Sequence, residues 1–335
     1  MYSIISLFIV IAWFSMSCND PQPENIQLSG ETQGTYYFIS YYDEQGRNFK
    51  SEVDSLLDGY MQSVSVYQEH SVISRFNRNE EDLVQDDIFR KNIKMALEIA
   101  EVSGGAFDPT VAPLVDAWGF GADERENTDS LYIDSLRRWV GYESLEFSGG
   151  KLRKKHPETQ VNFNAIAKGY AVDLVSEFLA DNDIENYLVD IGGEVKTGGR
   201  KPGGKKWSVG IEKPAENKMS ERTVEVVIEP ENLAVATSGS YRRYYEKEGN
   251  IYSHTINPRT GRPVEHNLLS VSVVTESCAA ADAWATAFMV MGTDSTIEFI
   301  EHNPQLDLQV FLIYADEERK FQTVQSDGFE QYLRK

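Results

Sequence analysis

The stretch Tyr187-Leu-Val-Asp-Ile-Gly-Gly-Glu194 decides how the rest of the chain is interpreted. Its first five residues are rich in strand formers and predict a β-strand, which the paired glycines end. Two further glycine pairs, Gly198-Gly199 and Gly203-Gly204, follow closely. This spacing is not the G-x-G-x-x-G dinucleotide fingerprint, and no strand–helix–strand unit surrounds it. The stretch therefore predicts tight turns beside a sheet edge rather than a doubly wound nucleotide-binding fold.

Helix candidates precede this strand, and strand candidates follow it. Apolar spacing, acidic starts and glycine stops predict helices at Phe49–Val64, Asp86–Val102, Asp129–Val140 and Ala165–Ala180, the last capped by Asn164. The other predicted strands are Thr35–Tyr42, Trp207–Ile211, Thr223–Ile228, Leu233–Thr237, Ile251–Ile256, Leu269–Val274, Leu308–Tyr314 and Phe321–Val324. Two helices, Ala279–Met291 and Ser295–Glu301, interrupt this run. The order predicts an α+β fold, a single composite domain in which a mixed or antiparallel sheet is packed with helices.

The charge balance limits the class of ligand. The chain has 335 residues and a formal net charge of −21. Such an acidic chain is not expected to bind nucleic acid, because that binding rests on neutralisation of phosphates by Lys and Arg. A small phosphate ligand would need local positive charge, from a metal ion or from a few placed basic side chains.

The N-terminus resembles a bacterial lipoprotein signal. The apolar run Ile4–Phe14 is too short to span a membrane but suits a signal peptide, and small residues then lead to Cys18. We interpret residues 1–17 as the signal peptide, Cys18 as the lipidation site, 18–27 as a tether and 28–335 as the folded domain. The protein is then exported and anchored on the periplasmic side of a bacterial membrane, with the inner membrane expected. A plain secretory signal is the alternative.

Two segments carry the residues expected to do chemistry. The first, Ser253-His-Thr-Ile-Asn-Pro-Arg-Thr-Gly-Arg-Pro263, places an imidazole and a guanidinium at a turn. His254 suits a general base for a hydroxyl proton, and the alternative is a structural histidine bonded to a turn carbonyl. Arg259 is interpreted either as a phosphate ligand or as a residue that holds its turn. The second segment places the oxygens of Asp282 and Thr286 on one helix face, as hard metal ligands or as a helix-packing pair.

A third segment, Asn162–Tyr170, runs into a predicted helix start, where free N–H groups favour an anion. Lys168 adds a positive charge there, and Ala165 can offer its carbonyl to a cation. The alternative is an ordinary capped helix with a surface lysine. The remaining cysteine, Cys278, is interpreted as a small buried residue at the start of an alanine-rich helix rather than as a catalytic thiol.

Taken together, the motifs resemble those of the ApbE-type FAD:protein FMN transferases, and the resemblance extends from Thr32 to about Gly292. The motifs occur in the family's order. They are Thr32-Gln-Gly-Thr35, Tyr67 with Ser74-Arg-Phe-Asn77, Gly105–Val111 with Trp118-Gly-Phe-Gly121, Ala165–Asp173, Ile191-Gly-Gly-Glu194, Ala234–Gly239, His254–Pro263 and Asp282-Ala-Trp-Ala-Thr286.

The resemblance implies a function. Members bind FAD and Mg²⁺, attach FMN through its phosphate to a Thr or Ser hydroxyl of an exported flavoprotein, and release AMP. The implied partners are FAD and an acceptor such as a subunit of an Rnf-type or sodium-pumping Nqr-type redox complex. Residues 28–335 would then form a flavin transferase domain. The same site with water as acceptor would make an FAD pyrophosphatase, and a third possibility is a non-enzymatic FAD-binding lipoprotein.

The resemblance also assigns roles to residues. Asp282 and Thr286 correspond to side-chain ligands of Mg²⁺, and Ala165 to a ligand through its carbonyl. His254 corresponds to the base that activates the acceptor hydroxyl. The flavin-nucleotide contact positions are Gln33, Tyr67, Ala106, Phe107, Asp108, Asn162, Lys168 and Ile256. Asn162, Asn164 and Asn257 depart from the Asp, Gly and Asp that are common in the family. Ala285 lacks a carboxylate that some members carry, so no second metal is predicted from that position.

Overall fold

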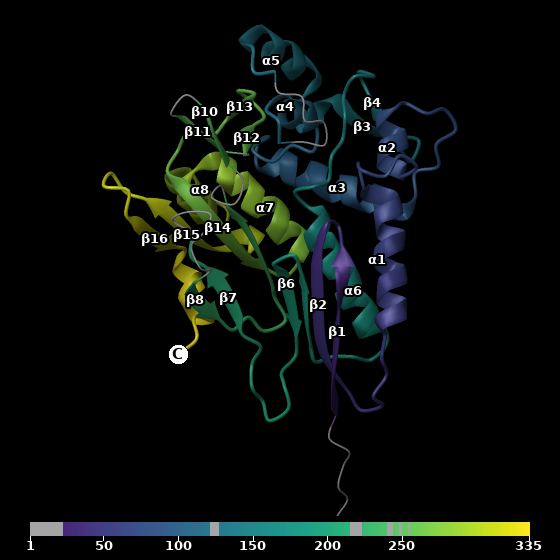
Figure 1. The fold of residues 1–335 in the computed structure, drawn as a ribbon, viewed down its shortest axis with the longest axis vertical. Helices are drawn as coiled ribbons and strands as arrows, with labels where there is room; N and C mark the ends of the chain where they lie inside the picture. Colours follow the sequence, from purple (N-terminus) through teal and green to yellow (C-terminus); the bar gives the residue numbers. More distant parts are fainter. Residues whose placement is uncertain (1–22, 121–126, 215–222, 240–243, 248–249, 254) are drawn as a thin grey trace, which may run out of the picture.

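The computed structural model describes residues 23–120, 127–214, 223–239, 244–247, 250–253 and 255–335. Within these residues the centre of the fold is an eight-stranded sheet (Figure 1). In spatial order its strands are β1 (Glu24–Thr32), β2 (Thr35–Asp43), β5 (Tyr187–Ile191), β6 (Glu194–Gly198), β9 (Ala234–Gly239), β14 (Leu268–Thr275), β15 (Gln309–Ala315) and β16 (Phe321–Gln325). Each neighbouring pair is antiparallel, which confirms the predicted α+β class.

Helices and short ladders complete the fold. The helices are α1 (Lys50–Val64), α2 (Val72–Asn77), α3 (Asp87–Val102), α4 (Ala112–Ala117), α5 (Ser130–Leu136), α6 (Ala167–Asp181), α7 (Cys278–Met291) and α8 (Thr293–His302). The two-stranded ladders are β3 (Leu145–Ser148) with β4 (Lys151–Lys154), β7 (Val209–Glu212) with β8 (Val224–Ile228), β10 (Tyr244–Lys247) with β11 (Asn250–Ser253), and β12 (Ile256–Asn257) with β13 (Arg262–Pro263). Among the described helices, none is long and apolar enough to cross a membrane.

The layers place α6 and α7 at the centre of the molecule. Both helices pack on one face of the sheet, α6 on β5 and β6 and α7 on β9 and β14. The helices α1 and α3 cover them from outside (Figure 1). The opposite face of the sheet has a smaller core, in which Phe311 packs with Ile228 of β8 and with Phe329 from a C-terminal 3₁₀ segment. Because both faces are covered, β14 is buried almost throughout, including its Ser270 and Ser272 side chains.

The structure corrects the predicted start of the folded domain. The strand β1 begins at Glu24, so residues 24–27, which were predicted to belong to the tether, lie in the sheet. Only Ile26 and Leu28 of this edge strand are buried. Two buried apolar residues among nine leave a weak strand pattern, which is why the sequence suggested a polar tether. Cys18 and the predicted signal peptide lie outside the described residues.

The structure also corrects two helix boundaries. The helix α6 begins at Ala167 rather than Ala165, and Asn164 does not cap it. The N–H groups of Ile166 and Ala167 both donate to the Phe163 carbonyl, so the chain makes a turn before the helix begins. The helix predicted at Asp129–Val140 is α5 followed by a 3₁₀ turn, because the α-helical hydrogen bonding stops at Leu136. The strand predicted at Ile251–Ile256 is divided between β11 and β12.

Candidate functional site

The candidate site is built where the starts of α6 and α7 meet. Asp173 of α6 reaches the first turn of α7 and accepts hydrogen bonds from the N–H groups of Cys278 (3.0 Å) and Ala279 (2.9 Å) and from the Ser277 hydroxyl (2.8 Å). A carboxylate in this place satisfies donors that a helix start leaves free and complements the helix dipole. Asp173 therefore fixes α7 against α6, and Lys196 neutralises its charge at 2.8 Å.

Gly169 lets the two helices approach closely. A Cβ atom built on Gly169 would lie 2.2 Å from the carbonyl oxygen of Cys278, so only glycine fits here. The N–H of Gly169 donates to Asp282 Oδ2 at 3.1 Å. In a regular helix the same N–H would donate to the carbonyl four residues earlier, at Ala165. Within the described residues the Ala165 carbonyl oxygen accepts no hydrogen bond, so it is available to a ligand.

The predicted metal ligands therefore have suitable surroundings. Asp282 is 4 % exposed, and Thr286 lies one helical turn further along α7 and is half-buried. The Thr286 hydroxyl is 3.4 Å from the Ser238 hydroxyl, so it is only weakly engaged. A carboxylate, a hydroxyl and a free carbonyl form a hard oxygen set, which fits Mg²⁺. The described residues contain no cluster of three or more His, Cys, Asp or Glu side chains that could hold a metal, so the other ligands would be water or substrate oxygens.

Lys168 lies at the same junction and is paired with a residue that the sequence interpretation overlooked. Its Nζ is 2.5 Å from Glu194 Oε1. Burial, together with the charge of Asp282, raises the pKa of the Glu194 carboxyl to about 7, although the Lys168 ammonium opposes the shift. The sequence placed Glu194 in a turn at the sheet edge and gave it no role. The signal available in the sequence was an acidic residue directly after the glycine pair that ends a predicted strand.

Three further predicted contact residues, Gln33, Tyr67 and Asn162, make hydrogen bonds at the start of α6 or with the residues just before it. Gln33 has a left-handed backbone (φ +52) in the β1–β2 turn, and its side-chain amide donates to the Ala167 carbonyl at 3.4 Å. Tyr67 is 66 % exposed and its hydroxyl accepts from Asn164 at 3.4 Å. Asn162 in turn accepts from the Asn164 N–H at 2.6 Å. The structure thus brings Tyr67 and Asn162 together through Asn164, whose side chain was predicted to cap the helix.

The predicted contact residues Ala106, Phe107 and Asp108 are all buried in the loop after α3. The Asp108 carboxylate is occupied within its own loop, where it accepts from Thr110 (N–H 2.8 Å, hydroxyl 2.6 Å) and from the Tyr142 N–H (2.9 Å). Burial raises its pKa to about 6 although these bonds favour the charged form. Phe107 is 2 % exposed and packs in the main core. The Asp108 side chain therefore shapes the loop that carries these three residues.

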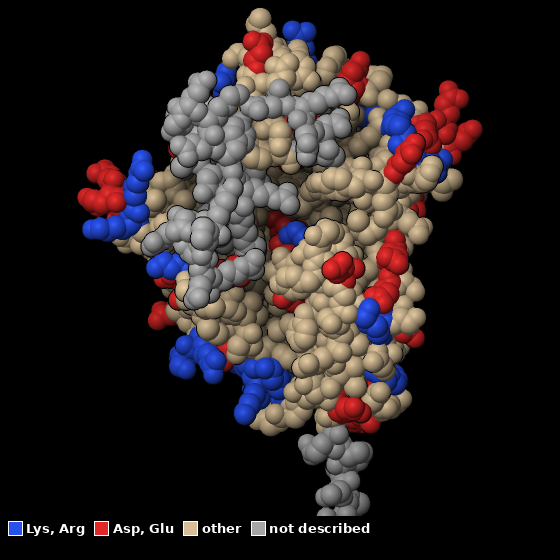
Figure 2. Space-filling model, in the orientation of Figure 1, with Lys and Arg blue, Asp and Glu red and all other residues tan. Residues whose placement is uncertain are grey.

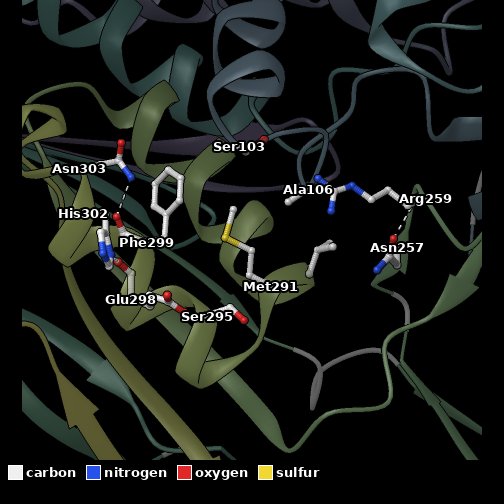
Figure 3. A pocket seen from close by; sticks show the side chains of 11 residues that line it. Ser103, Ala106, Asn257, Arg259, Met291, Ser295, Glu298, Phe299, His302 and Asn303 are labelled. Atoms are coloured by element: carbon white, nitrogen blue, oxygen red, sulfur yellow. Dashed lines mark hydrogen bonds between the residues drawn. The ribbon is translucent and has the colours of Figure 1, made fainter.

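Ala106 borders a cavity of ≈ 510 Å³ between the loop after α3, the β12–β13 turn, the end of α7 and α8. Figure 3 shows the Arg259 side chain extending towards Ala106, with Met291 and Phe299 on the side formed by α7 and α8. The Arg259 guanidinium donates to the Gly104 carbonyl, so it ties the two loops together. This contact favours the structural interpretation of Arg259.

Ile256 is 5 % exposed and packs in a separate apolar cluster with Leu114, Trp118 and Ile133. No described contact connects it with Lys168 or Asp282. His254 lies outside the described residues.

Figure 2 shows a hollow near the centre of one face of the molecule, with acidic and basic side chains at its floor. Cys278 is fully buried as the first residue of α7, as the sequence predicted.

Known proteins share this sequence and fold. A family model described as the ApbE family matches residues 33–311. An FAD:protein FMN transferase of Vibrio cholerae is 37% identical in an alignment 327 residues long that covers 95% of each chain. One of Haemophilus influenzae is 34% identical in an alignment that is 344 residues long with its gaps and covers 98% of each chain.

Solved structures agree with these matches. The flavin transferase ApbE from Vibrio cholerae superposes with a TM-score of 0.81 at 35% identity, covering 93% of this chain and 100% of that one. The Pseudomonas stutzeri flavinyl transferase ApbE, in its apo form, gives a TM-score of 0.82 at 32% identity, covering 93% and 97%.

Proposed function

The chain belongs to the ApbE family, and on that premise we propose that it transfers FMN from FAD to a hydroxyl of an acceptor flavoprotein. The oxygen of an acceptor Thr or Ser attacks the FMN phosphorus of FAD. A new P–O bond joins FMN to the acceptor as a phosphoester, the P–O bond of the pyrophosphate breaks, and AMP leaves.

The observation that supports this proposal most is the diversion of the Gly169 N–H from Ala165 to Asp282. Among the described residues it leaves the Ala165 carbonyl oxygen free, one helical turn before the glycine that binds the buried Asp282 carboxylate, with the Lys168 ammonium at the same helix start. Positive charge and cation-binding oxygens in one place are what a pyrophosphate substrate requires in a chain of net charge −21.

Asp282, Thr286 and the Ala165 carbonyl would hold Mg²⁺. When bound there, Mg²⁺ supplies positive charge that offsets the phosphate charges of the reaction. Lys168 would orient the pyrophosphate. We assign the removal of the acceptor hydroxyl proton to His254, on the family resemblance and on the suitability of imidazole as a base near neutral pH.

The assay uses purified protein, FAD, Mg²⁺ and an acceptor domain from an exported flavoprotein, with the intact mass of the acceptor as readout. An addition of the size of FMN supports transfer. Free FMN and AMP with an unmodified acceptor would indicate an FAD pyrophosphatase, and intact FAD after long incubation would indicate binding alone.

Two variants test the assigned residues. Asp282→Ala should abolish turnover, and near wild-type activity at saturating FAD and limiting Mg²⁺ would contradict the metal assignment. His254→Ala should keep FAD binding and lose transfer, and loss of both would mean that His254 has a structural role.

The location and the acceptor are part of the same proposal. Export, cleavage before Cys18 and lipidation of that cysteine would hold the enzyme at the periplasmic side of a bacterial membrane, where exported acceptors of the Rnf or Nqr type are found. Metabolic labelling with a fatty acid tests the anchor. Equal labelling of the wild type and Cys18→Ser would contradict it.

A further inference from the structure

Glu194 is a buried carboxylate that is only half satisfied. The residue is 3 % exposed, and its Oε1 forms the ion pair with Lys168 at 2.5 Å. Within the described residues, Oε2 is buried without a hydrogen-bond partner. Leaving a buried acceptor unpaired typically costs about 1–3 kcal/mol, and such exceptions call for an explanation.

The backbone holds Glu194 rigidly at this position. It is the first residue of β6, directly after the two-residue turn Gly192-Gly193, whose φ angles of +64 and +101 suit glycine. Asp190 accepts a hydrogen bond from the Gly193 N–H at 2.9 Å, and the Gly192 N–H donates to the Tyr36 carbonyl at 3.0 Å. The turn therefore fixes where the carboxylate stands.

The same turn makes room for the lysine. A Cβ atom on Gly192 would lie 3.4 Å from Lys168 Cδ and 2.7 Å from a Thr35 methyl carbon. The Lys168 side chain therefore runs past Gly192 to reach Glu194. Its side chain is 31 % exposed, against 4 % for Glu194, so the pair has one buried and one accessible member.

Two carboxylates compete for this ammonium. Burial lowers the pKa of Lys168, but the charges of Asp282 and Glu194 outweigh burial and raise it. A lysine side chain is flexible, and an ammonium that turned to Asp282 would occupy a carboxylate assigned to the cation. Of the two carboxylates, it is Glu194 with which the ammonium forms its ion pair, at 2.5 Å.

Stability alone does not explain the pair. A buried ion pair can often be replaced by neutral residues at no cost to folding, because desolvation offsets the attraction. A half-satisfied carboxylate is less favourable still. The pair is therefore better explained by its effect on ligand binding.

We propose that Glu194 is a positioning residue, which holds the Lys168 ammonium towards the phosphates of FAD and away from Asp282. This rests on the proposed function, because FAD is the ligand assigned to Lys168 there. A lysine that is already held in place loses less conformational freedom when the ligand binds, so FAD binds more tightly.

A double-mutant cycle on FAD affinity tests the proposal. FAD dissociation constants are measured by flavin fluorescence without Mg²⁺, so that no turnover occurs, for the wild type, Glu194→Gln, Lys168→Met and the double variant. We expect each single variant to weaken binding by about 10- to 100-fold, as for loss of a charge-assisted bond. The double variant should bind no more weakly than Lys168→Met, because Glu194 acts through Lys168.

The matched control is Glu231→Gln, which makes the same change in the exposed Arg200–Glu231 pair (2.7 Å) and should leave FAD affinity unchanged. We expect the thermal midpoint of Glu194→Gln to stay near that of the wild type. If Glu194→Gln does not fold, Glu194→Asp keeps the charge, shortens the reach and completes the cycle.

Failure of the role of Glu194 and failure of the proposed function give different results in this experiment. The role of Glu194 would be overturned if the double variant lost FAD affinity by the product of the two single losses. Wild-type FAD affinity in Glu194→Gln would overturn it as well. A wild-type protein that does not bind FAD would overturn the proposed function itself.

Discussion

The contact between α6 and α7 makes Gly169→Ala the most informative single change. The new Cβ atom would lie 2.2 Å from the carbonyl oxygen of Cys278, 2.6 Å from its carbonyl carbon and 2.8 Å from the Cα of Ala279. All three are backbone atoms, so no side chain can rotate away. To reach ordinary van der Waals distance, α7 must move away from α6 by roughly 1 Å.

The magnitude follows from three effects. Overpacking costs about 1–3 kcal/mol. Moving α7 lengthens the 3.1 Å bond from the Gly169 N–H to the buried Asp282 carboxylate, a charged hydrogen bond that contributes about 1.5–3 kcal/mol. Alanine is favoured over glycine in a helix by about 1 kcal/mol, which offsets part of the loss. We therefore expect the free energy of unfolding to fall by about 2–5 kcal/mol.

Urea unfolding measures the loss of stability, and the FMN transfer assay measures the loss of activity. A displacement of this size at Asp282 should reduce the transfer rate by about 100-fold. The control is Gly59→Ala in α1, where glycine is exposed and a new Cβ atom meets nothing within 4 Å. It should gain up to about 1 kcal/mol and keep full activity. Wild-type stability and activity in Gly169→Ala would refute the reasoning about this helix contact.

Two further changes test the surroundings of the site. Asp173→Ala removes the carboxylate that accepts from the first N–H groups of α7 and leaves Lys196 unpaired. The free energy of unfolding measured with urea should therefore fall by about 3–5 kcal/mol. An unchanged free energy of unfolding would contradict the anchoring role of Asp173. Burial raises the pKa of Asp108 from 3.8 to about 6, so folding favours the protonated carboxyl. The contribution of Asp108 to stability is therefore full below pH ~4 and is lost as the pH rises through 6. This change in the free energy of unfolding is at most about 3 kcal/mol. Relative to the wild type, Asp108→Asn should lack this decline between pH 4 and 6, and identical pH profiles of unfolding would show that Asp108 does not titrate there.

The local sequence pattern was sufficient to predict many of the helices and strands. The strand Tyr187–Ile191 has the predicted bounds, and α7 begins one residue before the predicted helix. Asp282 and Thr286 share a helix face because i and i+4 positions always do. The order of the motifs was sufficient to identify the family. The edge strand β1 was missed since it buries only Ile26 and Leu28.

Contacts between distant segments could not be predicted in this way. The Gly169–Asp282 bond joins residues 113 apart in the chain, and the Asp173–Cys278 bond joins residues 105 apart. Both depend on how closely two helices approach, which side-chain volumes on several elements decide together. The pairing of Lys168 with Glu194 likewise exists only because α6 packs on β5 and β6.

The sequence by itself therefore determined the α+β class, the family and the shared helix face of Asp282 and Thr286, because these follow from local periodicity and from the order of motifs. Only the tertiary structure decided that the Ala165 carbonyl is free among the described residues, that Arg259 ties two loops together, and that a buried glutamate accompanies Lys168. The physical reason is that hydrogen bonds and ion pairs in a site depend on which donors and acceptors remain once the helices have packed.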